Sequence, residues 1–204
     1  MVSDDPELHL PILPEPYQAA IKLSFLAPSG YGKTTAAGIV GALFHAVNIR
    51  LAAPLYDLQR VIYNFIGKEN HDQQDGELLQ FLGAKIQREK PHFLALKFFD
   101  NVLHANIGQR SSIITNDDCR PHNYPYLKAW GFKFVAIQGV RRSRLDHTPI
   151  DPQNEIEWRV DQIPHDLLLC NTGDLAQLRS AVQEMMENHF NVQEVLRHTD
   201  TNGM

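Results

Sequence analysis

The feature that most constrains this sequence is a glycine-rich loop set between an apolar run and an alanine-rich segment. Residues 21–26 (IKLSFL) form a short apolar run bounded by turn residues, which predicts a buried strand. The loop 27–32 (APSGYG) follows, and residues from Thr34 to about Val47 favour a helix. A strand, a glycine turn and a helix in this order indicate an α/β chain.

The loop continues into Lys33 and Thr34, and together they match the phosphate-binding pattern G-x-x-x-x-G-K-[ST] at every fixed position except the first, which is Ala27. Glycines let successive N–H groups turn toward phosphate oxygens, and the helix N-terminus adds positive potential. Lys33 then reaches the β- and γ-phosphates, and the Thr34 hydroxyl ligates Mg²⁺. We therefore predict that ATP and Mg²⁺ are the cofactors. The nucleotide-binding residues predicted in this loop are Ser29, Gly30, Tyr31, Gly32, Lys33, Thr34 and Thr35.

The rest of the chain alternates between strand and helix patterns. This alternation predicts a three-layer αβα fold with a mostly parallel five-stranded sheet, as in P-loop NTPases of the nucleotide-kinase type. The G-protein base signature N-K-x-D is absent, which argues against a switch GTPase. Strands are predicted near 48–52, 111–115, 132–138 and 166–170, and helices over 54–66, 77–88, 93–103, 123–130 and 175–188.

Composition excludes several other classes. A chain of 204 residues fits one domain, and no apolar run approaches the roughly 20 residues that span a bilayer, so no membrane partner is expected. The acidic N-terminus argues against a secretory signal, and two cysteines, Cys119 and Cys170, indicate a reduced, cytoplasmic protein. A net charge of −5 disfavours wholesale coating of nucleic acid, although a local basic groove remains compatible with it. Ten histidines lack metal-ligand spacing.

Beyond the loop, five short strings occur in the order typical of the phage-type deoxynucleoside monophosphate kinases, which this chain resembles over roughly residues 20–187. The strings are A-A-P-L at 52–55, L-Q-F-L-G at 79–83 with the later Arg88, D-C-R-P-H-N at 118–123, R-R-S-R at 141–144 and N-T-G at 171–173. The chain departs from that family at Tyr124, where the family has glutamate, and it lacks the usual tryptophan after Arg88.

The resemblance implies transfer of the γ-phosphoryl group of ATP to a (deoxy)nucleoside monophosphate. Four prolines predict an extended N-terminal arm at 1–17, which leaves the kinase domain at 18–189 and a C-terminal tail at 190–204. Within the domain, residues 54–107 would bind the acceptor and 141–164 would form a lid. Gln80, Arg88 and Arg120 are the predicted acceptor-binding residues, and Asn171 is a further nucleotide-binding residue. A host cytoplasm, if the chain is phage-encoded, and a homodimer are compatible with this family.

The predicted catalytic residues follow the third and fourth strands. Asp118 could hold a Mg²⁺-bound water or orient the acceptor, because strand ends line the site in open α/β sheets; Asp117 takes that role if the register is shifted, and a solvated turn is the alternative. Arg120 could hold an anionic group with a bidentate fork. The lid arginines, which with Lys33 complete the catalytic set, could stabilise the transferring phosphoryl group. They are Arg141, Arg142 and Arg144.

Three alternatives keep the loop but change the function. A related kind of phage kinase phosphorylates a 5-hydroxymethylpyrimidine in DNA; there Asp118 would act as a base and a basic groove would follow the DNA. A kinase of a small metabolite shares the same fold, and a non-catalytic nucleotide-binding module would bind ATP without turnover. The candidate groove residues for the DNA alternative are Lys85, Arg88, Lys90, Arg141, Arg142 and Arg144.

Overall fold

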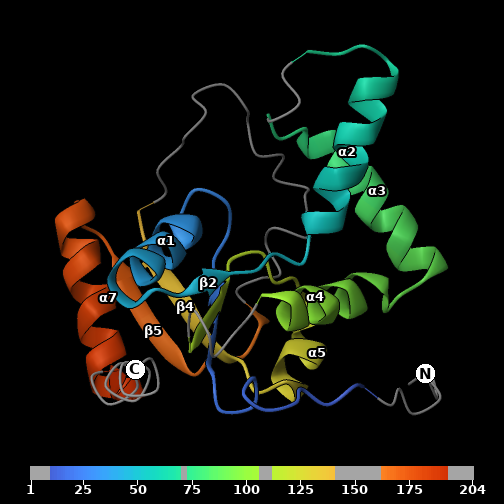
Figure 1. Ribbon diagram of the computed structural model, residues 1–204. Helices are drawn as coiled ribbons and strands as arrows, with labels where there is room; N and C mark the ends of the chain where they lie inside the picture. The colour runs from blue at the N-terminus through green and yellow to red at the C-terminus, as the bar shows by residue number, and fades with distance from the viewer. Residues whose placement is uncertain (1–9, 70–72, 106–111, 141–161, 193–204) are drawn as a thin grey trace, which may run out of the picture.

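The computed structural model describes residues 10–69, 73–105, 112–140 and 162–192, and within these ranges five strands form one sheet (Figure 1). Every neighbouring pair is parallel, and the strand order is β2-β3-β1-β4-β5. The three-layer α/β fold with a parallel five-stranded sheet that the sequence predicts is confirmed. The strands are β1 Ile21–Leu26, β2 Val47–Asn48, β3 Ile113–Asn116, β4 Lys133–Gly139 and β5 Leu167–Asn171.

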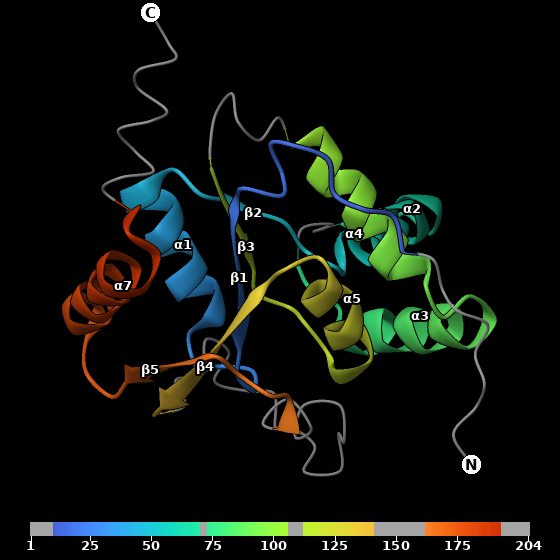
Figure 2. The ribbon, with the colours of Figure 1, turned by 90° about the horizontal axis from the view of Figure 1, so that it is seen from below.

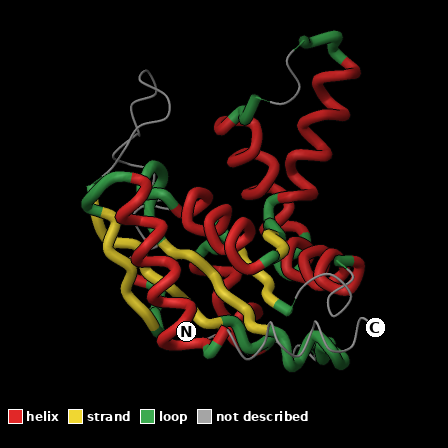
Figure 3. Tube along the Cα trace, turned by 60° about the vertical axis from the view of Figure 1, so that its left-hand side comes forward, coloured by secondary structure: helices red, strands yellow, loops and turns green. Residues whose placement is uncertain are grey.

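Helices cover both faces of the sheet. Figure 2 shows α1 and α7 on one side and α4 and α5 on the other, with α2 and α3 farther from the sheet on the side of α4 and α5. In Figure 3 this pair rises from the body of the molecule. The helices are α1 Lys33–Phe44, α2 Ala53–Phe65, α3 Gly76–Glu89, α4 Phe93–His104, α5 Tyr124–Ala129 and α7 Leu175–Phe190, with a 3₁₀ turn η1 at Pro121–Asn123.

The central strand β1 is buried on both faces, as a parallel sheet between two helical layers requires. Leu23 and Phe25 face the core shared with α1 and α7, and Leu26 faces the core shared with α4 and α5. A small third cluster of Leu55, Leu79 and Leu94 joins α2 and α3 to α4. The helical pair is therefore attached to the domain through few apolar contacts of its own.

Two element boundaries differ from the sequence prediction for identifiable reasons. Helix α1 ends at Phe44 rather than near Val47, because His45 takes a left-handed conformation with φ of 55°. Strand β2 covers only Val47–Asn48 rather than 48–52, because the backbone N–H groups of Leu51 and Ala52 turn away to bind a side chain that follows β3. The observed strand thus ends at the first residue of the predicted one.

The described part of the predicted N-terminal arm packs against the body of the domain. Leu13 is buried, the Trp130 indole N–H donates to the Pro11 carbonyl oxygen at 3.0 Å, and the Tyr17 hydroxyl donates to the Leu103 carbonyl oxygen at 2.6 Å. Most of the predicted lid and tail, 141–161 and 193–204, lies outside the described residues.

A search of the described helices for a membrane span finds none that is both long enough and sufficiently apolar.

Candidate nucleotide and acceptor site

The glycine-rich loop connects β1 to α1 through two residues in the left-handed region. Gly30 has φ of 85° and Gly32 has φ of 96°, a conformation that side chains with a Cβ rarely adopt. A Cβ on Gly32 would also lie 2.6 Å from the Asn171 amide nitrogen. Both glycines are therefore required by the shape of the loop, and α1 begins directly after it at Lys33.

Ala27 stands where the phosphate-binding pattern has its first glycine, and the loop keeps its shape with alanine at this position. Ala27 is buried and packs with Ala36, Ala37 and Leu178 in the core shared by α1 and α7. Among the described residues, left-handed φ values at non-glycine positions occur only at His45 and Asn191. Position 27 consequently needs no glycine here, and its methyl group fills core space.

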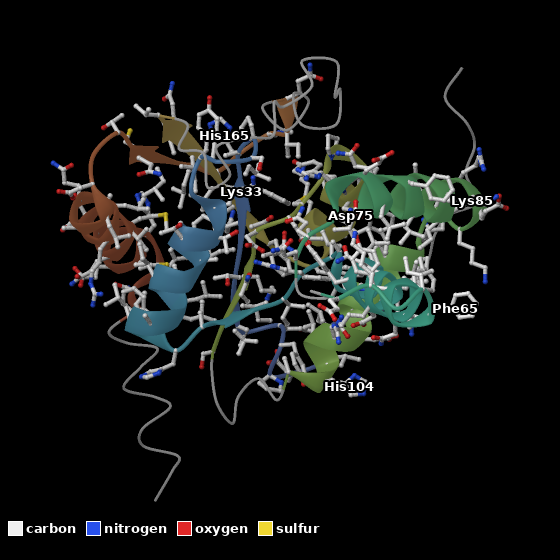
Figure 4. The ribbon with its side chains drawn as sticks, turned by 90° about the horizontal axis from the view of Figure 1, so that it is seen from above. Lys33, Phe65, Asp75, Lys85, His104 and His165 are labelled. Atoms are coloured by element: carbon white, nitrogen blue, oxygen red, sulfur yellow. The ribbon has the colours of Figure 1, made fainter. Side chains whose placement is uncertain are left out.

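The Lys33 ammonium lies over the loop. Its Nζ donates to the carbonyl oxygens of Ala27 at 2.6 Å and Pro28 at 2.9 Å, so the amine is held at the loop's concave backbone. Figure 4 places Lys33 at the start of α1, with Asp75, Phe65 and Lys85 marking the helical pair on the far side. Thr34 and Thr35 follow on the first turn of α1 and are exposed.

Asn171, at the end of β5, holds the loop from the side. Its Nδ2 donates to the Tyr31 carbonyl oxygen at 2.9 Å, and the residue is only 5% exposed. The other amide atom, Oδ1, has no hydrogen-bond partner within the described part of the chain. The structure thus places Asn171 against the loop backbone, where it fixes the loop's conformation.

Asp118 follows β3 and binds the backbone that leads into α2. Its carboxylate accepts hydrogen bonds from the N–H groups of Leu51 at 2.9 Å and Ala52 at 2.8 Å, and from the Asn116 amide at 2.7 Å. Burial raises the pKa of Asp118 above its usual range, against the opposing effect of the backbone N–H donors. Three of the four lone-pair positions of the carboxylate are occupied in this way.

Asp117 binds Arg50, a residue that the sequence analysis did not single out. The Arg50 Nε and Nη2 each lie 3.2 Å from a different oxygen of Asp117, and the Asn48 amide donates to the same carboxylate at 3.2 Å. The Asp117 side chain is 2% exposed, whereas that of Arg50 is 40% exposed. The prediction of a strand over 48–52 treated Arg50 as a strand residue. Its place near the end of an edge strand was the one feature of the sequence that could have indicated a role at the site.

We call residues 48–52 with Asp117 and Asp118 the β2–α2 junction. Two polar chains cross the ends of three strands there, because the parallel register sets Ser24 beside Asn116 and Asn48 beside Thr115. The Ser24 hydroxyl donates to Asn116, whose amide donates to Asp118. The Thr115 hydroxyl donates to Asn48, whose amide donates to Asp117. The carboxyl edge of the sheet therefore carries two hydrogen-bonded polar chains that are mostly buried, with Asn48 exposed at the edge strand.

Arg120 lies just beyond this network, half-buried, and its carbonyl oxygen begins η1. Burial lowers the pKa of His122, and the positive charge of Arg120 lowers it further. The neighbouring Cys119 is buried, and loss of solvation raises the pKa of its thiol to about 12. The structure thus brings Asp118 and Arg120 to the same edge as the loop.

The other predicted acceptor residues lie elsewhere. Gln80 and Arg88 are exposed on α3, and the Arg88 Nε lies 3.8 Å from a Glu89 oxygen. Helix α3 packs against α2 and α4. The lid residues Arg141, Arg142 and Arg144 lie outside the described residues.

The residues present fit Mg²⁺ in part. Thr34 offers an exposed hydroxyl at the helix start, which suits a metal that also takes phosphate and water ligands. Asp118 retains one lone-pair position beside its three N–H donors. Within the described ranges, no group of three or more His, Cys, Asp or Glu side chains forms a metal cluster. A metal here would depend on the bound nucleotide for most of its ligands.

The fold and the loop define a P-loop α/β protein. No protein-family model matches the chain, and no curated protein matches it either. Among solved structures it is similar to a shikimate kinase from Bacteroides thetaiotaomicron (15% identity, 82% of this chain and 97% of that one, TM-score 0.42). It is also similar to a shikimate kinase from Acinetobacter baumannii in complex with shikimate (11%, 86% and 96%, 0.46) and a gluconokinase from Sinorhizobium meliloti 1021 (12%, 84% and 97%, 0.39). With TM-scores below 0.5, these similarities do not identify a substrate for this protein.

Proposed function

We propose that this protein is a Mg²⁺- and ATP-dependent kinase that transfers the γ-phosphoryl group to the phosphate of a (deoxy)nucleoside monophosphate. The observation that carries the proposal is the glycine loop with Lys33 at the carboxyl edge of the sheet, an edge that also carries Arg50 and Arg120 beside the carboxylates of Asp117 and Asp118. A phosphoryl donor site and an anion-binding acceptor site on one sheet edge are what this reaction requires.

In this proposal, positioning and charge neutralisation supply the catalysis. Lys33 and the loop N–H groups bind the β- and γ-phosphates of the donor, and the Thr34 hydroxyl is a ligand of the metal. Mg²⁺, when bound, neutralises charge on the β- and γ-phosphates. Arg120 binds the acceptor phosphate, and Asn171 keeps the loop in the binding conformation. The lid residues Arg141, Arg142 and Arg144 are predicted from the sequence to stabilise the transferring phosphoryl group.

The hydrogen bonds that the Asp118 carboxylate already accepts favour a phosphate acceptor over a hydroxyl acceptor. A phosphate is already anionic and needs no base, whereas a hydroxymethyl group gains from one. The raised pKa of Asp118 would suit a base, but geometry decides first, and both carboxylate oxygens already accept N–H hydrogen bonds. In the proposed enzyme Asp118 is a positioning residue for the entry into α2.

A phosphate-transfer screen tests the proposal. Purified protein is given γ-labelled ATP and Mg²⁺ with each nucleoside monophosphate, nucleoside, small metabolites that include shikimate and gluconate, and hydroxymethylated DNA. We expect labelled diphosphate from at least one monophosphate. Label on DNA or on a metabolite alone would select that acceptor instead, and tight ATP binding without transfer to any acceptor would indicate a non-catalytic nucleotide-binding module.

A further inference from the structure

Arg50 has one side of its guanidinium fixed and the other side available. Nε and Nη2 are held by the two oxygens of Asp117, while Nη1 has no hydrogen-bond partner among the described residues. Asp117 is buried and is itself held by the Asn48 amide. The fork is therefore oriented before any ligand arrives, which reduces the ordering cost of binding an anion.

Tyr56 presents a second donor in the turn that follows, and its backbone N–H donates to the Ala52 carbonyl oxygen at 3.3 Å. It lies on the first turn of α2, half-buried, and its hydroxyl has no hydrogen-bond partner within the described ranges. Burial raises the pKa of Tyr56, whereas the positive charges of Arg50 and Arg120 act on it in the opposite direction. The hydroxyl therefore lies within electrostatic range of both guanidiniums and stays protonated, as a donor, at neutral pH.

The β2–α2 junction explains why this arrangement is rigid. Asp118 fixes the N–H groups of Leu51 and Ala52, which lie between Arg50 and Tyr56 in the chain. Asp117 fixes Arg50 itself. The two adjacent carboxylates thus hold residues 50–52, and the first turn of α2 connects Tyr56 to this held segment through the Ala52 carbonyl oxygen, so the ordering needed when a ligand binds is small.

We propose that Arg50 and Tyr56 form an oxyanion-binding subsite for the phosphate of the acceptor, beside Arg120. This inference rests on the proposed function and assigns two further residues that bind the acceptor phosphate and select for it. Arg50 Nη1 and the Tyr56 hydroxyl donate to acceptor oxygens, and Asp117 is the positioning residue that aims the guanidinium. A neutral hydroxyl or base would leave the guanidinium without an anion, so the unphosphorylated nucleoside gains nothing from the subsite.

The test compares Arg50→Met and Tyr56→Phe with Arg60→Met, a control on α2 whose arginine forms an exposed pair with Asp57. Initial rates give the acceptor and ATP KM values, and calorimetry without ATP gives the affinities for the monophosphates and their nucleosides. We expect Arg50→Met to raise the acceptor KM and Kd about 10- to 100-fold and Tyr56→Phe about 2- to 10-fold. In both variants the ATP KM and the affinity for the nucleoside should stay within about twofold of the wild-type values, and in Arg60→Met all four quantities should do so.

Because Arg50→Met leaves the buried Asp117 carboxylate without its partner, the double variant Arg50→Met/Asp117→Asn is measured beside it, with thermal unfolding as the check on folding. An unchanged acceptor KM in a folded variant overturns the inference while the kinase proposal stands. If the wild type transfers to no monophosphate, the kinase proposal fails; monophosphate binding lost in the Arg50 variants then still supports the subsite. Monophosphate binding absent from the wild type, or retained by the variants, overturns it.

Discussion

The carboxyl edge of the sheet carries two polar regions, the glycine loop after β1 and the β2–α2 junction, and different kinds of contact build them. The loop is shaped by residues 27–34, close in the chain, through left-handed glycines and the hydrogen bonds of Lys33 to loop carbonyls. The junction is shaped by carboxylates that bind residues 66 to 69 positions away. The loop therefore depends mainly on its own residues, with one distant hydrogen bond from Asn171, whereas the junction couples the acceptor region to the fold.

This difference predicts how each region responds to substitution. A side chain that projects from the loop toward the nucleotide can be removed without exposing core or orphaning a buried donor. A junction carboxylate cannot be removed in that way, because its loss leaves buried N–H groups unpaired. Loop variants should lose activity while they keep stability, and junction variants should lose both.

Lys33→Ala should give the largest effect on activity. Loss of a preorganised phosphate contact is worth about 10²–10³ in kcat or more, while the free energy of unfolding falls by only about 1 kcal/mol, because the Ala27 and Pro28 carbonyls lose the Lys33 donor. Initial rates and urea denaturation measure the two quantities. Near-native turnover in this variant would place the donor phosphates away from the loop.

Asp118→Ala should give the largest effect on stability. The N–H groups of Leu51 and Ala52 would lose their acceptor, and an unpaired buried donor costs about 1–3 kcal/mol. We expect a lower free energy of unfolding in urea together with a higher acceptor KM. Asp118→Asn, which keeps one acceptor oxygen, should be milder, and excess Mg²⁺ should restore neither variant. If excess Mg²⁺ restored the activity of either variant, Asp118 would instead act on the metal, as predicted from the sequence.

Asn171→Ala should loosen the loop without removing any group that projects toward the donor. The Tyr31 carbonyl oxygen loses its amide donor, and a hydrogen bond of this kind contributes about 0.5–1.5 kcal/mol. The ATP KM is expected to rise about 2- to 12-fold, with the acceptor KM unchanged. Asn64→Ala on the exposed face of α2 is the matched control. Equal ATP KM values in the two variants would mean that Asn171 does not support the loop.

The smallest expected effect concerns pH and the start of α3. The Leu78 N–H and the Tyr63 hydroxyl both donate to Asp75, and these hydrogen bonds lower the pKa of Asp75. A lowered folded-state pKa stabilises the fold above the unfolded value of about 3.9, and this stabilisation is lost as the pH falls through the folded value. Asp75→Asn keeps a good N-cap for α3 but cannot ionise, so it lacks only the charge-dependent part of this stabilisation. The difference in the free energy of unfolding between wild type and Asp75→Asn should therefore shrink as the pH falls from 6 to 3. A pH-independent difference would contradict this.

The sequence predicts the elements and the loop well because both depend on neighbours in the chain. The apolar run at 21–26, the glycines and the start of α1 all act within a few residues of one another. The partners of Asp117 and Asp118 could not be predicted, because they depend on the register between β2 and β3. Arg50 was missed for the same reason, since its role is defined by a carboxylate 67 positions away.

The two thiols of this protein differ in a way that is useful to an experimenter. Cys119 is buried and its pKa is raised to about 12, so almost none of it is thiolate at neutral pH, whereas Cys170 is exposed and directly precedes Asn171. Thiol reagents react with the thiolate, so a maleimide dye should attach at Cys170 alone. A fluorophore there would be covalently adjacent to the residue that holds the glycine loop. Nucleotide binding could thus be followed as an emission change in the native sequence, with no cysteine introduced or removed.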